Sequence, residues 1–250
     1  MRSTSKPDLS IIIPALNESK RIAKTLDKLA LFIKNNKLIK SLIVEVIIVS
    51  ADCIDDSHKI IRSKAELFDN FIFMKAGPVA GKGRDVRLGM LKARGKAVIF
   101  MDADLATPLK YLPIFYESYL SGNDVVVATR NLKKHHPERL RRSLSIAGNI
   151  LYRILGGVWI EDSQCGFKLF SSRAAKSSFS KLTTSGWGFD MEVLTIAKIN
   201  NFKIKSFRID DWRSVPGGTF SDGALASSLS SLQELFKIFR HRMTRRYQDK

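Results

Sequence analysis

The sequence predicts an α/β fold, built as a mostly parallel central sheet flanked by helices. Strand-like and helix-like segments alternate through the first half of the 250 residues, which is typical of parallel sheets with helical crossovers. The strand-like segments are continuous apolar runs, as expected for strands buried on both faces. The composition, 44% hydrophobic and 26% charged, is that of a folded globular chain. No linker-like stretch interrupts it, so we expect one domain over residues 1–250.

The expected elements follow one another in a regular order. A buried strand at Leu9–Pro14 precedes a helix at Asn17–Asn35, which carries Ile22, Leu26 and Leu29 on one face. Ligands of such sheets bind beyond the carboxyl ends of the strands, so the residues directly after each strand are the first to inspect. The remaining expected elements are a strand at Val44–Ser50, a helix at Asp55–Phe68, a strand at Asn70–Lys75, a helix at Asp85–Arg94, and strands at Lys96–Asp102 and Asp124–Thr129.

The charge is strongly basic and unevenly spread. There are 42 Lys and Arg against 24 Asp and Glu, a net charge of +18, which favours a negative partner. Residues 130–153 hold seven basic residues and one acid, and residues 237–250 hold six and one. Both regions interleave basic and apolar residues at helical spacing. Each is either an amphipathic helix that lies on an anionic membrane surface or a helix that packs on the core with a solvated basic face.

Several classes of protein are excluded or disfavoured. Cys53 and Cys165 are too few for a disulfide scaffold and show no zinc-site spacing, which favours reduced thiols in the cytoplasm. We see no signal peptide, and no apolar run reaches the length of about 18 residues that a transmembrane helix needs. The chain lacks the aromatic pattern of RNA-binding sheets, zinc fingers and basic-zipper heptads. We therefore expect no nucleic acid partner.

The strongest chemical signal is Asp102-Ala103-Asp104, which directly follows the apolar run 98–101. Two carboxylates at i and i+2 on a turning backbone can converge on one hard cation. Mg²⁺ or Mn²⁺ would keep some of its waters there and also bind a diphosphate. In the alternative interpretation, Asp104 caps the following turn and Asp102 is solvated.

Two further segments follow strands or precede helices. Pro14-Ala15-Leu16-Asn17-Glu18 closes the first strand, where Asn17 or Glu18 either accepts from a base or ribose hydroxyl or caps the next helix. The basic loop Gly81-Lys82-Gly83-Arg84 matches neither a Walker A motif nor a dinucleotide fingerprint. It is either an anion site at a helix N-terminus or a flexible basic turn.

The second half contains two polar clusters. Residues 162–168, D-S-Q-C-G-F-K, combine several polar side chains with a glycine between apolar residues. Residues 187–192, W-G-F-D-M-E, place Asp190 and Glu192 beside two aromatic residues. Each cluster is either part of a site or a structural turn, and Asp190 is a good N-cap candidate for the apolar helix that follows.

Five motifs in this order resemble those of the inverting family 2 glycosyltransferases of the GT-A fold. They are P-A-L-N-E, G-K-G, D-A-D-L-A-T-P, D-S-Q-C-G-F-K-L-F and W-G-F-D-M-E, and they extend from about Leu9 to about Trp212. More narrowly, this set of motifs resembles that of the dolichyl-phosphate β-glucosyltransferases and their polyprenyl-phosphate relatives, and the fourth motif is the most specific part of the match. The resemblance implies a nucleotide-sugar-binding half over residues 9–129, an acceptor-binding half over 130–220 and a basic C-terminal helix over 221–250.

The resemblance also implies an activity. It implies transfer of a sugar, glucose from UDP-glucose first, to a polyprenyl or dolichyl phosphate, with Mg²⁺ or Mn²⁺ and with inversion. The protein would be peripheral on the cytosolic face of a membrane, held there by the basic amphipathic helices. The alternatives are a related transferase that uses GDP-mannose or another donor, a transferase with a non-lipid acceptor, and an inactive membrane-binding relative.

The resemblance assigns roles residue by residue. A phosphate acceptor is already an anion, so Asp190 is expected to orient a sugar hydroxyl or the acceptor rather than to remove a proton. Many relatives carry two acids after the second strand, whereas only Asp52 lies there in this chain. The resemblance implies catalytic roles for Asp190, Asp104, Arg130 and Lys168, and metal binding by Asp102 and Asp104. It implies acceptor binding by Arg130, Arg139, Arg142 and Trp187, and it places Asp162 and Glu192 near the sugar. The residues that it assigns to nucleotide-sugar binding are Pro14, Ala15, Asn17, Glu18, Asp52, Gly81, Lys82, Arg87, Asp102, Ala103, Asp104, Gln164 and Arg213.

Overall fold

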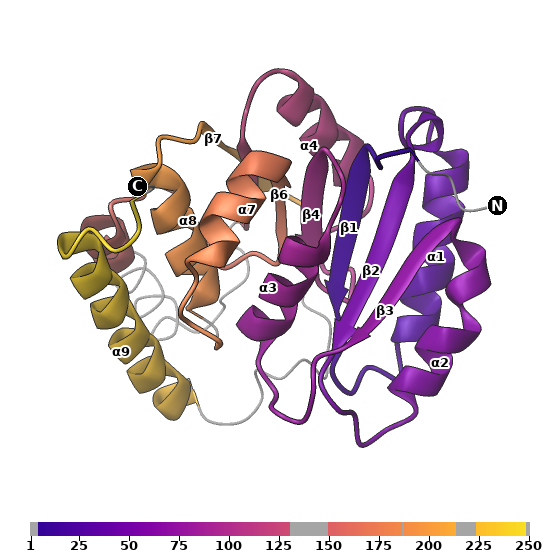
Figure 1. Cartoon of the computed structure of the whole chain (residues 1–250), viewed down its shortest axis with the longest axis horizontal. Coiled ribbons are helices and arrows are strands. Elements are labelled where there is room, and N and C mark those ends of the chain that lie inside the picture. The colour runs from indigo at the N-terminus through magenta and orange to yellow at the C-terminus, as the bar shows by residue number, and fades with distance from the viewer. Residues whose placement is uncertain (1–4, 131–149, 187, 214–223, 249–250) are drawn as a thin grey trace.

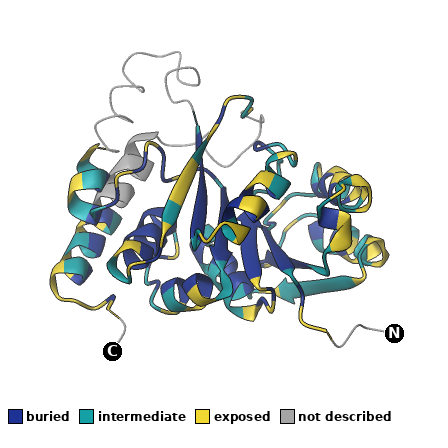
Figure 2. Ribbon diagram, turned by 90° about the horizontal axis from the view of Figure 1, so that it is seen from above, coloured by how far each residue is buried: buried dark blue, intermediate teal, exposed yellow. Residues whose placement is uncertain are grey.

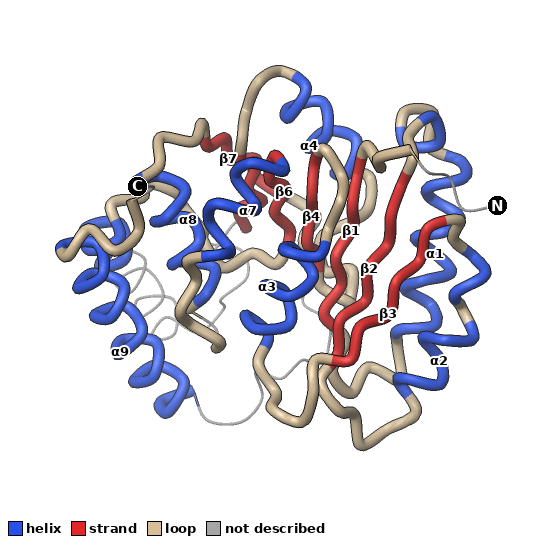
Figure 3. Tube along the Cα trace, in the orientation of Figure 1, coloured by secondary structure: helices blue, strands red, loops and turns tan. Residues whose placement is uncertain are grey.

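A seven-stranded sheet with the order β3-β2-β1-β4-β6-β5-β7 forms the centre of the molecule (Figures 1 and 3). The computed structural model describes residues 5–130, 150–186, 188–213 and 224–248, with the backbone alone over 224–232. Six strands run parallel, and only β6 is antiparallel to its neighbours. The predicted α/β class with a mostly parallel sheet is confirmed. The strands are β1 (Leu9–Pro14), β2 (Val44–Ser50), β3 (Asn70–Lys75), β4 (Ala97–Met101), β5 (Val125–Arg130), β6 (Phe167–Ser171) and β7 (Ile204–Ile209).

The helices differ from the predicted ones mainly at their ends. The predicted Asn17–Asn35 helix begins only at Ile22, and the predicted Asp55–Phe68 helix is a short helix followed by a 3₁₀ turn. Residues 150–156 are also helical. The labelled helices are α1 (Ile22–Asn35), α2 (Ser57–Ser63), α3 (Lys82–Lys92), α4 (Tyr111–Leu120), α7 (Ser172–Ser180), α8 (Phe189–Ile199) and α9 (Ala224–Met243), with 3₁₀ turns at Ile39–Ser41 and Ala65–Leu67.

Helices cover both faces of the sheet, because successive side chains of each strand point to opposite faces. On one face Ile12 and Phe100 belong to a cluster with α3, α7, α8 and α9. On the other face Ile11 and Ile99 belong to a cluster with α1 and α4. The buried strands therefore lie between two helical layers (Figure 2).

The reversed direction of β6 shapes the edge where the strands end. The carboxyl ends of the six parallel strands and the amino end of β6 lie at this edge. Met101, the last residue of β4, pairs with Phe167, the first of β6. As a result, the loop that follows β4 meets the loop that precedes β6. This places the third and fourth sequence motifs, D-A-D-L-A-T-P and D-S-Q-C-G-F-K-L-F, at one edge of the sheet.

The two basic regions differ in what the structure describes. Residues 131–149 lie outside the described part of the chain. Near the C-terminus, α9 is a helix as predicted, with Leu235 and Ile238 buried and Phe236 and Met243 exposed. Within the described ranges, no helix combines the length and the apolar character needed to cross a bilayer.

Candidate active site

Asp102 and Asp104 lie in the loop after β4, as predicted. The Asp102 carboxylate forms an ion pair with Lys82, with 2.6 Å between Oδ1 and Nζ. Asp104 Oδ1 accepts a hydrogen bond from the backbone N–H of Ala106 at 2.9 Å. Burial, reinforced by the nearby Asp102 charge, raises the pKa of Asp104 above its ordinary value. The interpretation that Asp104 caps the following turn is therefore correct for one of its two oxygens. The negative charges of Asp102 and Asp104 also repel each other.

Gly166 is what lets the loops after β4 and before β6 meet. The Asp102 N–H donates to the Gly166 carbonyl at 3.0 Å. A Cβ atom built on Gly166 would collide directly with the Asp102 carboxylate. The glycine of the D-S-Q-C-G-F-K motif is thus required by the carboxylate of the D-x-D motif.

Lys82 is the first residue of α3 and belongs to the predicted basic loop. Burial opposes its charged form, but the carboxylates of Asp102 and Asp190 raise the pKa of Lys82 above its ordinary value. The loop is seated by a hydrogen bond from the Gly83 N–H to the Ser185 carbonyl at 3.0 Å. The predicted anion site therefore has a fixed lysine, which already neutralises one acid of the D-x-D motif.

Lys168 and Asp190 form a fully buried ion pair beneath this edge. Lys168 extends from β6, is 0% exposed, and donates both to the Asp190 carboxylate and to the Cys165 carbonyl, the latter at 2.6 Å. Burial raises the pKa of Asp190, whereas Lys168 and Lys82 oppose this shift. Asp190 is the second residue of α8, and Gly188 precedes the helix. The predicted N-cap at Asp190 is therefore wrong.

Arg130 and Asp162 form a second buried pair at the end of β5. The guanidinium is held by both carboxylate oxygens, at 2.6 Å from Nε and 3.0 Å from Nη2. It also lies 5.3 Å from the ring centre of Trp212. Burial opposes both charges, yet the pairing raises the pKa of Arg130 and lowers that of Asp162. This geometry fixes a permanent cation at the edge of the sheet.

The loop after β1 is fastened to the loop after β2. The Asn17 N–H donates to Cys53 Sγ at 3.3 Å, and the Ile54 N–H donates to Asn17 Oδ1 at 3.0 Å. Asn17 has a φ of 54°, a left-handed conformation that asparagine tolerates better than most residues. The predicted helix cap at Asn17 is wrong, because its side chain bridges two loops instead.

Glu18 faces the acids of the D-x-D motif from this loop. Its carboxylate forms an ion pair with Arg21. Burial, with further contributions from Asp104, Asp102 and Asp55, raises the pKa of Glu18 from 4.5 to about 7, although Arg21 opposes the shift. The nucleoside end and the D-x-D end of the predicted site are therefore electrostatically coupled.

The raised pKa of Glu18 predicts a pH-dependent stability in metal-free buffer. Between pH 4.5 and 7 the unfolded chain has released this proton while the folded protein keeps it, so stability falls as the pH rises through this window. The shift corresponds to an effect on the order of 3 kcal/mol. Chemical denaturation of wild type and Glu18→Gln from pH 4 to pH 8 measures it. We expect the variant to gain stability relative to wild type across that window, and a constant difference would contradict the assignment.

Other predicted residues have different surroundings. Arg87 donates to the carbonyls of Phe179 and Ser180, so its guanidinium joins α3 to the end of α7. Asp52 and Gln164 are exposed. Pro14 and Ala15 end β1 and begin the fastened loop, and Ala103 is buried between the two acids of the D-x-D motif.

Exposed Arg213 approaches the D-x-D loop through its backbone N–H, which donates to the Ala106 carbonyl at 3.0 Å. Arg139, Arg142 and Trp187 lie outside the described residues.

The carboxylates of Glu192 and Asp190 have different partners, although the sequence analysis predicts that both lie near the sugar. Its buried carboxylate accepts hydrogen bonds from the N–H groups and hydroxyls of Thr183 and Thr184, and from the Tyr247 hydroxyl at 2.7 Å. It therefore fastens α8 to the segment before it and to the chain after α9. The place for Glu192 near the sugar stays a prediction, whereas its carboxylate accepts hydrogen bonds from Thr183, Thr184 and Tyr247.

Two residues that the sequence analysis does not predict as site residues contact segments of the site. The buried carboxylate of Asp85 on α3 accepts from the Ala51 N–H at 3.3 Å, directly after β2. It thus supplies an acid beside the segment where the sequence reading found only Asp52. Glu234 on α9 binds the N–H of Gly188 at 2.7 Å. Neither contact has a local sequence signal, because each joins elements far apart in the chain.

The donor set at the D-x-D loop fits Mg²⁺ or Mn²⁺. These ions prefer oxygen ligands and commonly take only one or two protein carboxylates, leaving positions for water and phosphate oxygens. Asp102 already binds one cation, the Lys82 ammonium. Among the described residues no group of three or more acidic, histidine or cysteine side chains forms a closed metal site. Cys165 is no candidate nucleophile, because burial raises the pKa of its thiol to about 12.

The chain matches known proteins in sequence over most of its length. Residues 10–179 match the family model described as Glycosyl transferase family 2. Over 237 residues the chain is 29% identical to a dolichyl-phosphate beta-glucosyltransferase of Trichomonas vaginalis, and the match covers 92% of this chain and 72% of that protein. Over 243 residues it is 30% identical to the dolichyl-phosphate beta-glucosyltransferase of Dictyostelium discoideum, covering 92% and 73%.

The fold is also similar to that of solved structures. Glucosyl-3-phosphoglycerate synthase from Mycobacterium tuberculosis, in complex with Mn²⁺, UDP-glucose and phosphoglyceric acid, superposes with a TM-score of 0.64. The identity is 18%, and the alignment covers 94% of this chain and 80% of that one. At this identity the likeness shows the GT-A-like fold alone.

Proposed function

The chain belongs to glycosyl transferase family 2, and from this premise we propose that it transfers glucose from UDP-glucose to a dolichyl or other polyprenyl phosphate at a membrane surface. One observation carries the proposal. Asp102, paired with Lys82, lies at the same sheet edge as the buried Lys168–Asp190 pair and the Arg130–Asp162 pair. The site thus combines acids that can hold a divalent ion and its diphosphate with fixed cations that can bind a second phosphate. The names of the relatives, dolichyl-phosphate beta-glucosyltransferases, support a transferred glucosyl group and a dolichyl phosphate acceptor.

The departing diphosphate needs positive charge. A divalent ion held by Asp102 and Asp104 would supply Lewis-acid stabilisation of the leaving group when bound. Lys82 adds a cation at the same point, and its pairing with Asp102 keeps it charged and in place. Charge that is already oriented costs no reorganisation in the transition state.

The acceptor phosphate is an anion at neutral pH and can attack the anomeric carbon without a general base. Asp190 therefore acts by orientation. Its carboxylate is 2% exposed and is held by Lys168, so its place is fixed before it accepts a hydrogen bond from a hydroxyl of the sugar. An attack in line with the leaving diphosphate inverts the anomeric centre.

Arg130 binds the acceptor phosphate in this proposal. Its contacts with Asp162 and Trp212 hold the guanidinium at the end of β5, the strand from which the acceptor half begins. Arginine favours phosphate because its planar donors match the oxygen geometry. A fixed orientation lowers the entropy lost when the lipid phosphate arrives.

Helix α9 offers a face for the membrane. Phe236, Arg240 and Met243 recur at helical spacing, so they share one side of the helix, and Phe236 and Met243 are 61% and 65% exposed. The carbonyls of Ile154 and Leu155 accept hydrogen bonds from Arg242, which joins the helical residues 150–156 to α9. Exposed apolar side chains with neighbouring arginines suit an anionic lipid surface.

Charge reversal on this face tests the membrane contact. The double variant Phe236→Glu and Met243→Glu is expected to reduce sedimentation with phosphatidylserine liposomes at least tenfold, because it removes two inserting side chains and adds repulsion. UDP-glucose binding should be retained. The matched control is Leu31→Glu, at a residue that is 61% exposed. Its helix, α1, lies at the opposite end of the molecule from α9 (Figure 1). Equal liposome binding by wild type and the double variant would disprove this contact.

A transfer assay tests the function itself. Purified protein is incubated with radiolabelled UDP-glucose or GDP-mannose and dolichyl phosphate in liposomes, with Mg²⁺ or with EDTA. We expect metal-dependent label in the organic phase from UDP-glucose. Label from GDP-mannose alone would replace the donor, and metal-dependent release of nucleoside diphosphate without lipid label would replace the acceptor. If neither lipid label nor nucleoside diphosphate release were detected, the result would favour an inactive relative.

A further inference from the structure

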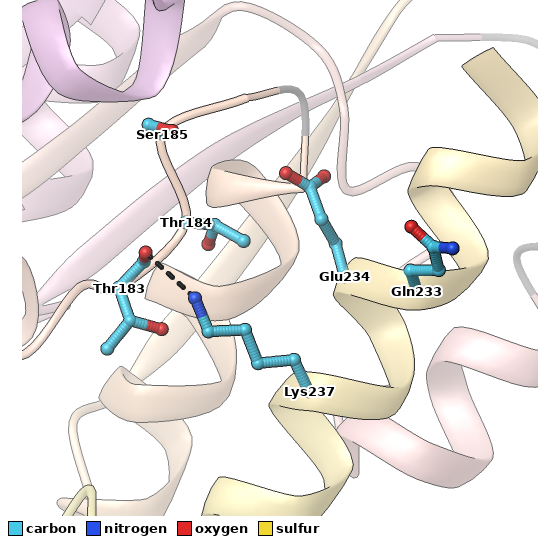
Figure 4. A pocket seen from close by; sticks show the side chains of 6 residues that line it. All are labelled: Thr183, Thr184, Ser185, Gln233, Glu234 and Lys237. Carbon is cyan, nitrogen blue, oxygen red and sulfur yellow. Dashed lines mark hydrogen bonds between the residues drawn. The ribbon is translucent and has the colours of Figure 1, made fainter. Parts of the chain in front are cut away.

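Helix α9 contacts the segment that leads into α8 through Glu234. The Gly188 N–H donates to Glu234 Oε2 at 2.7 Å. A Cβ on Gly186 would lie 2.7 Å from Oε1, and a Cβ on Gly188 would lie 2.5 Å from Oε2. The carboxylate therefore fills the space above both glycines, which flank residue 187. Figure 4 shows Glu234 extending from α9 toward this segment, beside Thr183, Thr184 and Ser185.

The opposite side of the same segment seats the basic loop. The Gly83 N–H donates to the Ser185 carbonyl at 3.0 Å. A Cβ on Gly83 would lie 2.7 Å from the Cβ of Phe189 and 3.0 Å from the Gly186 carbonyl oxygen. The segment is thus enclosed between Glu234 on one side and the loop that carries Lys82 on the other.

The contact also lies at the point where α8 begins. Gly188 is the residue before the helix, and its carbonyl accepts from the N–H groups of Met191 and Glu192 at 3.1 and 3.0 Å. A carboxylate at a helix N-terminus is stabilised by the oriented N–H groups there. Because Asp190 is the second residue of α8, the start of the helix determines where its carboxylate meets Lys168.

We propose that Glu234 is a positioning residue for the transfer reaction. It holds the segment that leads into α8, which contacts the loop of Lys82, so that the charges of Lys82 and Asp190 keep their places. The proposal rests on the proposed function, since it assumes that these charges act on the donor. Glu234 lies outside the region matched by the family model and was not among the residues predicted from sequence. It touches no reacting group and acts through Gly188.

Three variants test this role. Glu234→Ala removes the acceptor, Glu234→Gln keeps one acceptor oxygen of similar shape, and Gln233→Ala is a matched control on the same helix, lining the same cavity of about 300 Å³. We expect Glu234→Ala to lower kcat at least tenfold with less than a threefold change in KM for the acceptor. Glu234→Gln should recover most of that loss, and the control should equal wild type. A Glu234→Ala variant with wild-type kcat would overturn the proposal.

A double-mutant cycle separates positioning from general destabilisation. Gly188 has a φ of −71°, which alanine adopts readily, so the collision with Glu234 is the main obstacle to Gly188→Ala. This substitution should lower kcat about tenfold in wild type and by a clearly smaller factor in the Glu234→Ala background, because the carboxylate 2.5 Å from the added Cβ is then absent and only the Cβ of residue 234, at 3.0 Å, stays close. Equal losses in both backgrounds would contradict the proposal. Melting temperatures measured alongside identify any variant that fails to fold.

Amide hydrogen exchange distinguishes failure of this inference from failure of the proposed function. If wild type transfers no sugar from any donor, the proposed function is wrong, but the exchange of residues 185–190 still reports the contact. We expect Glu234→Ala to exchange faster there and at the start of α3, with the sheet unchanged. Unchanged exchange in this segment would overturn the placement of Glu234, whatever the activity of wild type.

Discussion

Replacing Lys168 with methionine is expected to destabilise the protein by about 3–5 kcal/mol and to abolish sugar transfer. The side chain is 0% exposed and binds Asp190, which is 2% exposed. Methionine fills much of the same volume but leaves the Asp190 carboxylate buried without its cation, and an uncompensated buried charge is strongly destabilising. Urea denaturation at pH 7 measures the loss of stability, and the radiolabelled transfer assay measures the loss of activity.

The pH dependence and a second substitution check the cause. Burial already raises the pKa of Asp190 in the wild type, and loss of Lys168 raises it further. Protonation then removes the charge, so the destabilisation of Lys168→Met should shrink as the pH falls. The double variant Lys168→Met and Asp190→Asn should regain much of the stability at pH 7 but none of the activity. A single variant within 1 kcal/mol of wild type would show that the pair is not a buried ion pair in solution.

The second large effect is expected for Asp102→Asn, which should lower transfer about a thousandfold with little change in stability. Asp102 is 30% exposed and pairs with Lys82 at 2.6 Å. The amide is a weaker ligand for a divalent ion and carries no charge to hold the lysine. Stability should change little because a partly exposed pair contributes little to folding. Transfer rates at increasing Mg²⁺ or Mn²⁺ measure the effect, and we expect a large increase in the metal concentration that gives half-maximal rate.

A matched control for this variant is Asp27→Asn on α1. Asp27 also pairs with a lysine, Lys64 at 2.6 Å, but it is 50% exposed and lies outside the site. Its activity and metal dependence should equal those of wild type. If Asp102→Asn kept full metal-dependent activity while Asp190→Asn had none, the roles assigned to the two acids would be wrong.

The strands and the order of the motifs could be predicted because apolar runs report burial directly. The direction of β6 could not. Its residues Phe167–Ser171 read as part of a motif, and a short sequence carries no information on whether a neighbouring strand is parallel or antiparallel. The start of α1 was also missed, since Asn17 has the character of a cap but is drawn into a bridge to Ile54. Tertiary contacts outweighed local preference in both places.

The acidic pairs show why part of the site could be predicted and part could not. Asp102 and Asp104 follow a strand on a turning backbone, where side chains at i and i+2 can face one region. Asp190 and Glu192 have the same spacing but lie on α8, and on a helix such side chains point in nearly opposite directions. Recognising this required the start of the helix at Phe189, which the short spacing of the two acids does not reveal.

The reversed strand β6 has a consequence for how the protein can vary. Because Arg130 ends β5 and Phe167 begins β6 at the same edge, the connection between them begins and ends at the edge that carries the D-x-D loop. Lengthening such a connection costs little free energy and shifts the register of neither strand. Insertions within this one connection can therefore change the surface beside the D-x-D loop while every strand pairing is kept.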